Sequence, residues 1–349
     1  MLNRSSKNPI IKPSDVKPSF EGYNVIGALN PAAALYNDEF ILLVRVAENC
    51  IPKEGKIRVP IYRFVEGDGI PDILEFDESD PDVKLKDTRG VVYKGVDYLT
   101  TLSHIRIARS KDGVNFKVDE KPFIYPCREE EKYGVEDARV TFIDGKYYIN
   151  YTIVSGDSWS TALSVTEDFK THKRLGIIFP PENKDVAIFP EKINGMYTAL
   201  HRPNNSGFGK ASIWYAESPD LIHWGGHRCI ARPRNTSFES MKIGGGSYPI
   251  KTPKGWLCIY HSKGDNSRYT LFAMLLDLKK PWIVTDRLDK PLLVPESDYE
   301  INGFFGNVVF SNGIVEKNDE LYIYYGASDD TSCVATTTVD YILSLFDLS

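Results

Sequence analysis

Strand-like alternation of apolar and polar residues, interrupted by tight turns, is the dominant pattern along this 349-residue chain. Helical periodicity is rare, and the turns are mostly Asp-Gly, Asn-Gly or Asn-Asp pairs, which favour short hairpin connections. Five hairpin-like segments can be aligned on their turns: AAALYNDEFILLVRV, ARVTFIDGKYYINYT, AIFPEKINGMYTALH, YPIKTPKGWLCIYHS and GIVEKNDELYIYYGA. The pattern predicts an all-β protein built from a repeated hairpin unit.

The spacing of these turns predicts how the units are arranged. Between the turn residues Asp38, Gly145, Gly195, Gly255 and Asp319 the intervals are 107, 50, 60 and 64 residues. The last three intervals each fit one four-stranded blade. The first interval is about as long as two blades but contains only one hairpin. We therefore assign residues 50–100 to outer strands and a long insertion. We expect residues 1–349 to form one five-bladed β-propeller with a central funnel; two stacked β domains are the alternative.

Composition narrows the class of partner and the location. The net charge of −6 lacks the basic excess that nucleic acids or anionic membranes favour. The five cysteines are widely spread with no metal-binding spacing, which indicates reduced thiols. No apolar run approaches the roughly 18 residues of a membrane span, and MLNRSSKNPIIKP does not resemble a secretion signal. We therefore expect a cytoplasmic protein. The sequence does not decide whether it forms a homo-oligomer.

Polar residues recur at corresponding positions ahead of the hairpin turns. Asp137 lies eight residues before Gly145, and Asn30 lies eight before Asp38. Lys184, Asp185, Lys242 and Asn307 occupy the corresponding segments of the other units. A solvated loop charge is the simpler interpretation of any one of them. Six at matching positions predict a small polar site at the mouth of the funnel, because the innermost strands of a propeller line its channel.

The basic members of this set indicate an anion site. The chain contains no HEXXH motif, no Gly-rich phosphate loop and no GxSxG or GxGxxG motif, so neither a metal nor an organic cofactor is predicted. Lys184, Arg202, Lys242 and His261 suggest that side chains hold the anion. Among the five tryptophans, Trp159 in the loop SGDSWS is the one that we expect at a binding rim.

Longer stretches of the chain resemble one known family. They are GVEDARVTFIDGKYYINYT, NKDVAIFPEKINGMYTALHRP, SPDLIHWG, MKIGGGSYPIKTPKGWLCIYH, NVVFSNG and YIYYGASD. In this order they are similar to glycoside hydrolase family 130, the β-mannoside phosphorylases and related β-1,2-mannosidases. The resemblance runs from NPIIKP to YYGASD. It implies a five-bladed propeller that cleaves a β-mannoside with phosphate and inversion, giving α-mannose 1-phosphate and a shortened acceptor.

The resemblance also implies residue roles. Asp137 matches the family's proton donor, which acts through the 3-hydroxyl of the mannosyl unit. The phosphate ligands fall on Lys184, Arg202, Lys242, Tyr260 and His261. The carbohydrate-binding residues that we assign are Asn30, Arg45, Glu136, Arg139, Asp185, Asn307 and Asp329. A phosphorylase needs cations in place of the second carboxylate of an inverting glycosidase, because phosphate is already an anionic nucleophile.

Two departures from the family pattern bear on these roles. Some members carry Arg-Asn at Lys184-Asp185, and many have proline at Ala138. Asp185 therefore either contacts sugar or orients Lys184. The NKD form around these residues is most like the β-1,2-mannobiose and β-1,2-oligomannan phosphorylases.

Three alternatives to a β-1,2-mannoside phosphorylase stay open from the sequence. The first is a phosphorylase acting on β-1,4-mannosides. The second is an inverting β-1,2-mannosidase, whose catalytic base would be Glu239 or Asp185. The third is a non-catalytic carbohydrate-binding propeller, in which Asp137 would have no chemical role.

Overall fold

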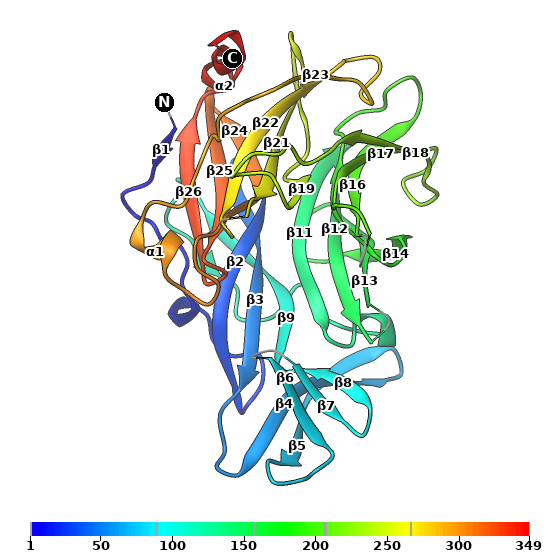
Figure 1. Cartoon of the computed structure of the whole chain (residues 1–349), viewed down its shortest axis with the longest axis vertical. Helices are drawn as coiled ribbons and strands as arrows, with labels where there is room; N and C mark the ends of the chain where they lie inside the picture. Colours follow the sequence, from blue (N-terminus) through cyan, green and yellow to red (C-terminus); the bar gives the residue numbers. More distant parts are fainter. Residues whose placement is uncertain (1, 88–89, 157, 205–207, 266, 349) are drawn as a thin grey trace.

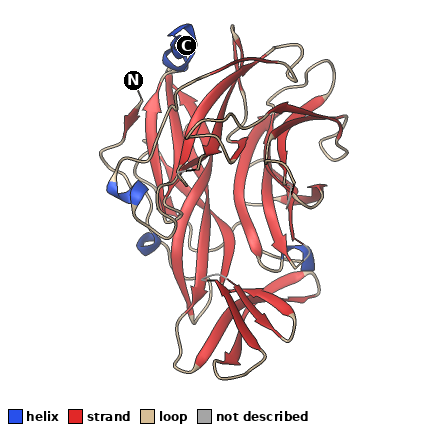
Figure 2. Ribbon diagram, in the orientation of Figure 1, coloured by secondary structure: helices blue, strands red, loops and turns tan. Residues whose placement is uncertain are grey.

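The computed structural model describes residues 2–87, 90–156, 158–204, 208–265 and 267–348, and strands dominate it (Figures 1 and 2). The helical elements are short: α1 (Asp298–Ile301), α2 (Val339–Leu345) and three 3-10 turns at Pro13–Asp15, Glu129–Glu131 and Phe346–Leu348. None of the described helices is long and apolar enough to cross a membrane. The predicted all-β class is confirmed.

Most strands pair antiparallel in groups of four that follow one another along the chain. The first group is β2 (Tyr23–Tyr36), β3 (Glu39–Cys50), β9 (Thr101–Ser110) and β10 (Lys117–Val118), and the second is β11 (Gly134–Ile143), β12 (Lys146–Ser155), β13 (Ser158–Thr166) and β14 (Lys173–Phe179). A parallel pairing of Gly134 with Ser103 joins these two groups into one sheet. The third group is β15 (Asn183–Ile188), β16 (Tyr197–Pro203), β17 (Ile213–Ser218) and β18 (Gly225–Ala231).

The fourth and fifth groups of strands lie mostly in the last third of the chain. The fourth contains β19 (Lys242–Gly245), β21 (Gly255–Lys263), β22 (Tyr269–Leu276) and β23 (Val284–Arg287), with β20 (Ile250–Thr252) beside β21. The fifth is β24 (Val309–Lys317), β25 (Glu320–Ala327), β26 (Thr331–Thr337) and β1 (Asn3–Arg4), so the chain's first strand completes a sheet made by its last ones. The first strands adjoin one another, β2 with β11 and β24, and β15 with β11 and β19. These five groups match the number of hairpin units predicted from the sequence, and their closure into a five-bladed propeller stays a prediction.

The turn chemistry explains the hairpins. All five predicted hairpins are present, and four of their turns place two consecutive residues at positive φ: Asn37-Asp38, Asp144-Gly145, Asn194-Gly195 and Asn318-Asp319. Two positive φ values define the type I′ turn, which matches the twist of paired strands and favours Asn, Asp and Gly. The turn residues that marked the repeat in the sequence therefore have a direct backbone role.

Residues 51–87 and 90–100 form an insertion between the paired strands β3 and β9. It contains a hairpin of β4 (Lys56–Val65) and β5 (Asp68–Asp77) and a three-stranded sheet of β6 (Val83–Asp87), β7 (Gly90–Tyr93) and β8 (Val96–Leu99). The expectation that part of this segment supplies outer strands was wrong, because these strands pair among themselves around their own small core. Figure 1 shows the insertion at the end of the molecule opposite the two termini.

Apolar clusters hold neighbouring groups together. Between the first two groups, Leu43 and Ile105 share a buried cluster with Val140 and Ile149. Between the second and third, Leu163 packs in a cluster with residues of β15 to β17. Because packed interiors resist deformation, the first strands of the groups are fixed relative to one another. Polar side chains on these strands are thereby held in place.

Candidate active site

A backbone irregularity recurs on the inner strands at the predicted polar positions. Asn30, Asp137 and Asp185 have φ values of 46°, 45° and 56°, and each lies in a register shift of its strand pair. A β-bulge re-aims side chains, and Asn and Asp tolerate the left-handed conformation better than most residues. Asn307, just before β24, has a φ of 63°. The spacing seen in the sequence therefore marks a repeated bulge, which explains why these positions carry short polar side chains.

Most predicted site residues meet around one cavity of about 400 Å³. Those that line it are Asn30, Arg45, Glu136, Asp137, Lys184, Asp185, Arg202, Lys242, His261 and Asp329. They come from all five groups of strands or the loops beside them. The structure thus brings together acids and cations that are widely separated along the chain.

Asp137 is buried at the side of this cavity between an arginine and an amide. Arg45 Nη1 donates to its Oδ1 over 3.2 Å, and Asn30 Nδ2 donates to the same oxygen over 2.9 Å. Arg45 also binds Glu136, with 2.7 Å between Nη2 and Oε1. Burial alone would raise the pKa of Asp137, but the charge of Arg45 and the bond from Asn30 hold it below its ordinary value. The other carboxylate oxygen is used by neither bond.

Asp185 organises the opposite side of the site. Its Oδ1 lies 3.1 Å from Arg139 Nη2, and its Oδ2 pairs with Arg202 Nε and lies 3.3 Å from His261 Nε2. Although burial opposes ionisation, Arg202 and His261 keep the pKa of Asp185 well below its usual range. Burial lowers the pKa of His261 to about 4, so the imidazole is neutral at pH 7 and donates from Nε2. Asp185 therefore orients Arg202 and His261.

Gly244, in the GGG run, is required by this arrangement. A Cβ atom there would lie 2.4 Å from Asp185 Oδ2 and 2.5 Å from His261 Cε1. Both side chains are buried, and moving either one away would break the ion pairs and contacts of Asp185 described above. The glycine run therefore allows strand β19 to approach the carboxylate and the imidazole closely.

Three cations converge on the same cavity. Lys184, Arg202 and Lys242 line it, and the ammonium of Lys242 lies 5.1 Å from the centroid of the Tyr269 ring. Burial, together with the charges of Arg202 and Lys184, lowers the pKa of Lys242 to about 8. Like charges held this close repel one another, and an anion between them relieves the repulsion. The electrostatics favour a bound anion such as phosphate.

Three predicted site residues lie outside this cavity lining. Tyr260 precedes His261 on β21 and projects to the opposite face, where its hydroxyl donates to Glu239 over 2.6 Å. Arg139 lies behind Asp185 and donates from Nε to the carbonyl of Gly246 over 2.7 Å. Asn307 contributes its backbone carbonyl, which accepts from the Tyr269 amide over 3.0 Å. We no longer assign Tyr260 to phosphate, and we treat Arg139 and Asn307 as supports of the site.

Other lining residues were not predicted. Lys263 and Tyr269 face each other across β21 and β22 and both line the cavity, as do Phe305, Val308 and Phe310. Lys263 is two residues after His261, so strand alternation could have placed it on the same face. Tyr269 had no comparable signal, because its position depends on the register between two strands.

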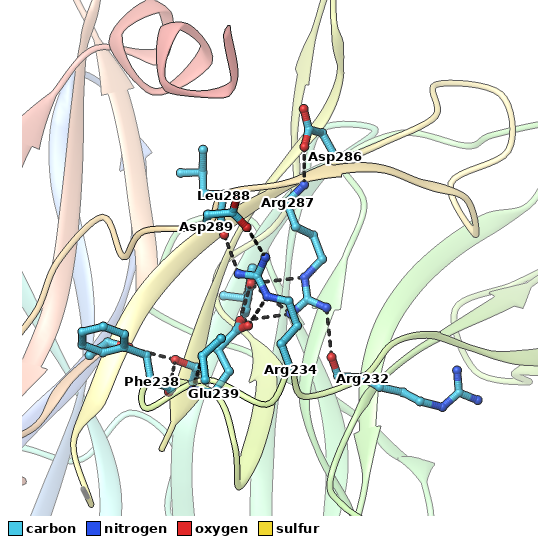
Figure 3. Close-up of polar contacts among 12 residues, drawn as sticks. Arg232, Arg234, Phe238, Glu239, Asp286, Arg287, Leu288 and Asp289 are labelled. Carbon is cyan, nitrogen blue, oxygen red and sulfur yellow. Dashed lines mark hydrogen bonds and ion pairs between the residues drawn. The ribbon is translucent and has the colours of Figure 1, made fainter. Parts of the chain in front are cut away.

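Glu239, the other candidate base for a hydrolase, is occupied elsewhere. It is fully buried, and its carboxylate pairs with Arg234 and lies 3.0 Å from Arg287 Nη2. Figure 3 shows this cluster of Arg234, Glu239 and Arg287 around a shared carboxylate. Because Glu239 is paired with two arginines, it stabilises the segment before Lys242. It does not line the described cavity.

A second cavity of about 550 Å³ adjoins the first and shares Arg45, Glu136 and Asp329 with it. Its other walls combine residues of the insertion with residues of other strands and loops, including Lys86, Asp97, Tyr98, Tyr133, Trp159 and Phe304. Trp159 is the tryptophan expected at a binding rim. The lining mixes aromatic rings with a few charged groups, the composition typical of carbohydrate and other small-ligand sites.

Comparisons with known proteins show which family the chain resembles. The family profile described as beta-1,4-mannooligosaccharide phosphorylase matches residues 89–348. A β-1,2-mannobiose phosphorylase of Listeria innocua is 46% identical over 98% of this chain and 97% of its own. A 1,2-β-oligomannan phosphorylase of a Thermoanaerobacter species is 39% identical over 70% of this chain and 84% of its own.

A solved structure extends the likeness to the fold. The Listeria innocua β-1,2-mannobiose phosphorylase in complex with β-1,2-mannobiose superposes with a TM-score of 0.93 and 44% identity, covering 100% of this chain and 99% of that one. The similarity in sequence and in fold therefore extends over nearly the whole chain. The chain belongs to glycoside hydrolase family 130, the family of the mannoside phosphorylases.

Proposed function

We propose that this protein catalyses the inverting phosphorolysis of β-1,2-mannobiose or short β-1,2-oligomannosides, giving α-mannose 1-phosphate and a shortened acceptor. The observation that carries the proposal is one cavity lined by a buried acid, Asp137, and by the cations Lys184, Arg202 and Lys242. The family relationship supports the same reaction, since the most similar relatives reported above are named as phosphorylases of β-1,2-mannosides.

In the proposed reaction, phosphate attacks the anomeric carbon from the side of the cations as the bond to the leaving oxygen breaks. The proton of Asp137 reaches that oxygen through the 3-hydroxyl of the mannosyl unit, so the acceptor leaves neutral. In the free protein the pKa of Asp137 is low because Arg45 and Asn30 stabilise its charge despite burial. An entering phosphate anion raises this pKa, and we propose that Asp137 takes up its proton as the substrates bind.

The adjoining cavity supports a site for the leaving sugar. It meets the first cavity at Arg45, Glu136 and Asp329, where the cleaved bond would lie. Tyr98 of the insertion and Trp159 of β13 offer aromatic faces to a sugar ring. We propose that the insertion serves acceptor recognition.

The hydrolase alternative has no free base among the two candidates. Asp185 is paired with Arg139, Arg202 and His261, and Glu239 is paired with Arg234 and Arg287. Each carboxylate would have to give up strong ionic bonds to activate water. The arrangement therefore favours phosphate over water as the nucleophile.

A panel of β-mannosides incubated with and without phosphate tests the proposal. We expect β-1,2-mannobiose to yield mannose 1-phosphate in a phosphate-dependent reaction, with β-1,4-mannobiose turned over much more slowly. Free mannose released at the same rate without phosphate would identify a hydrolase. Faster turnover of β-1,4-mannobiose would contradict the proposed specificity for the β-1,2 linkage. If neither disaccharide is turned over, the protein is better explained as a non-catalytic carbohydrate-binding protein.

The KM for phosphate should rise in alkaline solution because of Lys242. Its pKa of about 8 means that the ammonium loses its proton as the pH rises through 8, and the neutral amine binds an anion weakly. Phosphate is already a dianion in this range, so we expect the KM for phosphate to rise several-fold between about pH 8 and pH 9. Lys242→Arg keeps its charge and should lack this rise. An equal rise in that variant would show that another group titrates.

The proposed product also bears on location. A charged sugar phosphate crosses membranes poorly. It is therefore useful to a cell only when it is formed inside. We propose on this chemical ground that the enzyme acts in the cytoplasm, which fractionation of the native host's cells would test.

A further inference from the structure

We propose that Trp159 is a positioning residue that couples phosphate binding to acceptor binding, an inference that rests on the proposed function. Trp159 lines one of the two cavities and contacts a cation that lines the other. The ring lines the larger, acceptor-side cavity, and the Lys184 ammonium lies 5.4 Å from its centroid. Lys184 in turn lines the phosphate-side cavity. One side chain therefore contacts both a cation of the anion site and the proposed sugar site.

Strand pairing and one hydrogen bond place Trp159 beside Lys184. Trp159 pairs with Val154 at the start of the hairpin of β12 and β13. Two residues further along, Thr161 Oγ1 donates to the carbonyl of Asn183 over 3.2 Å, which ties β13 to the residue before Lys184. The segments that carry the indole and the lysine are thus hydrogen-bonded to each other, which keeps the ring and the ammonium side by side.

The chemistry of the indole suits both contacts. A tryptophan ring attracts a cation over its face, and its apolar surface packs against the C–H groups of a sugar ring. The indole Nε1 is buried and has no hydrogen-bond partner among the described residues. We infer that a bound acceptor fixes the ring, and that the fixed ring holds Lys184 in its phosphate-binding position.

Initial rates measured over a grid of phosphate and β-1,2-mannobiose concentrations test the coupling. In the unaltered enzyme we expect each substrate to lower the apparent dissociation constant of the other. In Trp159→Ala we expect both constants to rise by about 2- to 30-fold, the range of a cation–π contact, and the effect of each substrate on the other to disappear. Trp159→Phe, which keeps a smaller ring, should lie between the two.

A matched control is Trp282→Ala. Trp282 also carries a cation, with the Arg228 guanidinium carbon 4.5 Å from its ring centroid, but it lines neither of the two cavities. We expect this variant to keep the coupling. A second measurement is the double variant Trp159→Ala with Lys184→Met, whose effects on the phosphate constant should be less than additive if the ring acts through the lysine.

Two outcomes would overturn the inference. Trp159→Ala with unchanged coupling would show that the ring does not connect the sites, and fully additive effects with Lys184→Met would show that it acts elsewhere. These results differ from a failure of the proposed function, in which the unaltered enzyme itself would show no phosphate-dependent turnover.

Discussion

Replacing Asp137 by Asn should lower the rate of phosphorolysis by about 10²- to 10⁴-fold, the usual contribution of general acid catalysis. The amide has nearly the shape of the carboxylate but has no acidic proton to pass to the leaving oxygen. The KM values for phosphate and mannobiose should change far less than kcat, because the cations and the sugar-binding walls remain. Steady-state kinetics on purified protein, with a melting curve to verify folding, would measure this.

Asp144→Asn is a matched control for that variant. Asp144 lies on the same hairpin, is exposed and also has positive φ, at 49°. Asparagine suits its turn equally well, so activity and stability should stay unchanged. Unchanged turnover in Asp137→Asn would contradict the assigned role. A lowered melting temperature with normal kcat would indicate that the carboxylate is structural.

Replacing Arg202 by Ala should raise the KM for phosphate by about 10- to 100-fold. Charge-assisted hydrogen bonds contribute about 1.5–3 kcal/mol each, and Arg202 is placed to donate them to an anion in the cavity. The same change removes a buried partner of Asp185 and should lower the free energy of unfolding by about 3 kcal/mol. Phosphate-saturation kinetics and chemical denaturation would measure the two effects separately.

Arg63→Ala is a suitable control because its ion pair with Asp72 lies on the exposed hairpin of the insertion. Such surface pairs contribute at most about 1 kcal/mol, so neither the KM for phosphate nor the stability should change appreciably. A normal phosphate KM in Arg202→Ala would remove this residue from the proposed phosphate site and reopen the hydrolase interpretation.

The sequence by itself was sufficient for the hairpins and for much of the polar site. Turn pairs such as Asp144-Gly145 determine hairpins locally, through φ values that few residue types adopt. The bulges at Asn30, Asp137 and Asp185 recur at similar distances ahead of these turns, which is why counting from the turns found them. Their chemical roles, in contrast, came from the family resemblance, because spacing carries no information about a reaction.

Tertiary structure alone decided which faces of the strands meet. Tyr260 and His261 are adjacent in sequence, yet only His261 lines the cavity, because the pleat sends neighbours to opposite sides. Tyr269 enters the site through the pairing of β21 with β22, and Trp159 of β13 contacts Lys184 of β15, which belongs to a different group of strands. Such placements depend on register and on packing between distant segments. Local patterns in the chain determine neither, since each results from burying many apolar side chains at once.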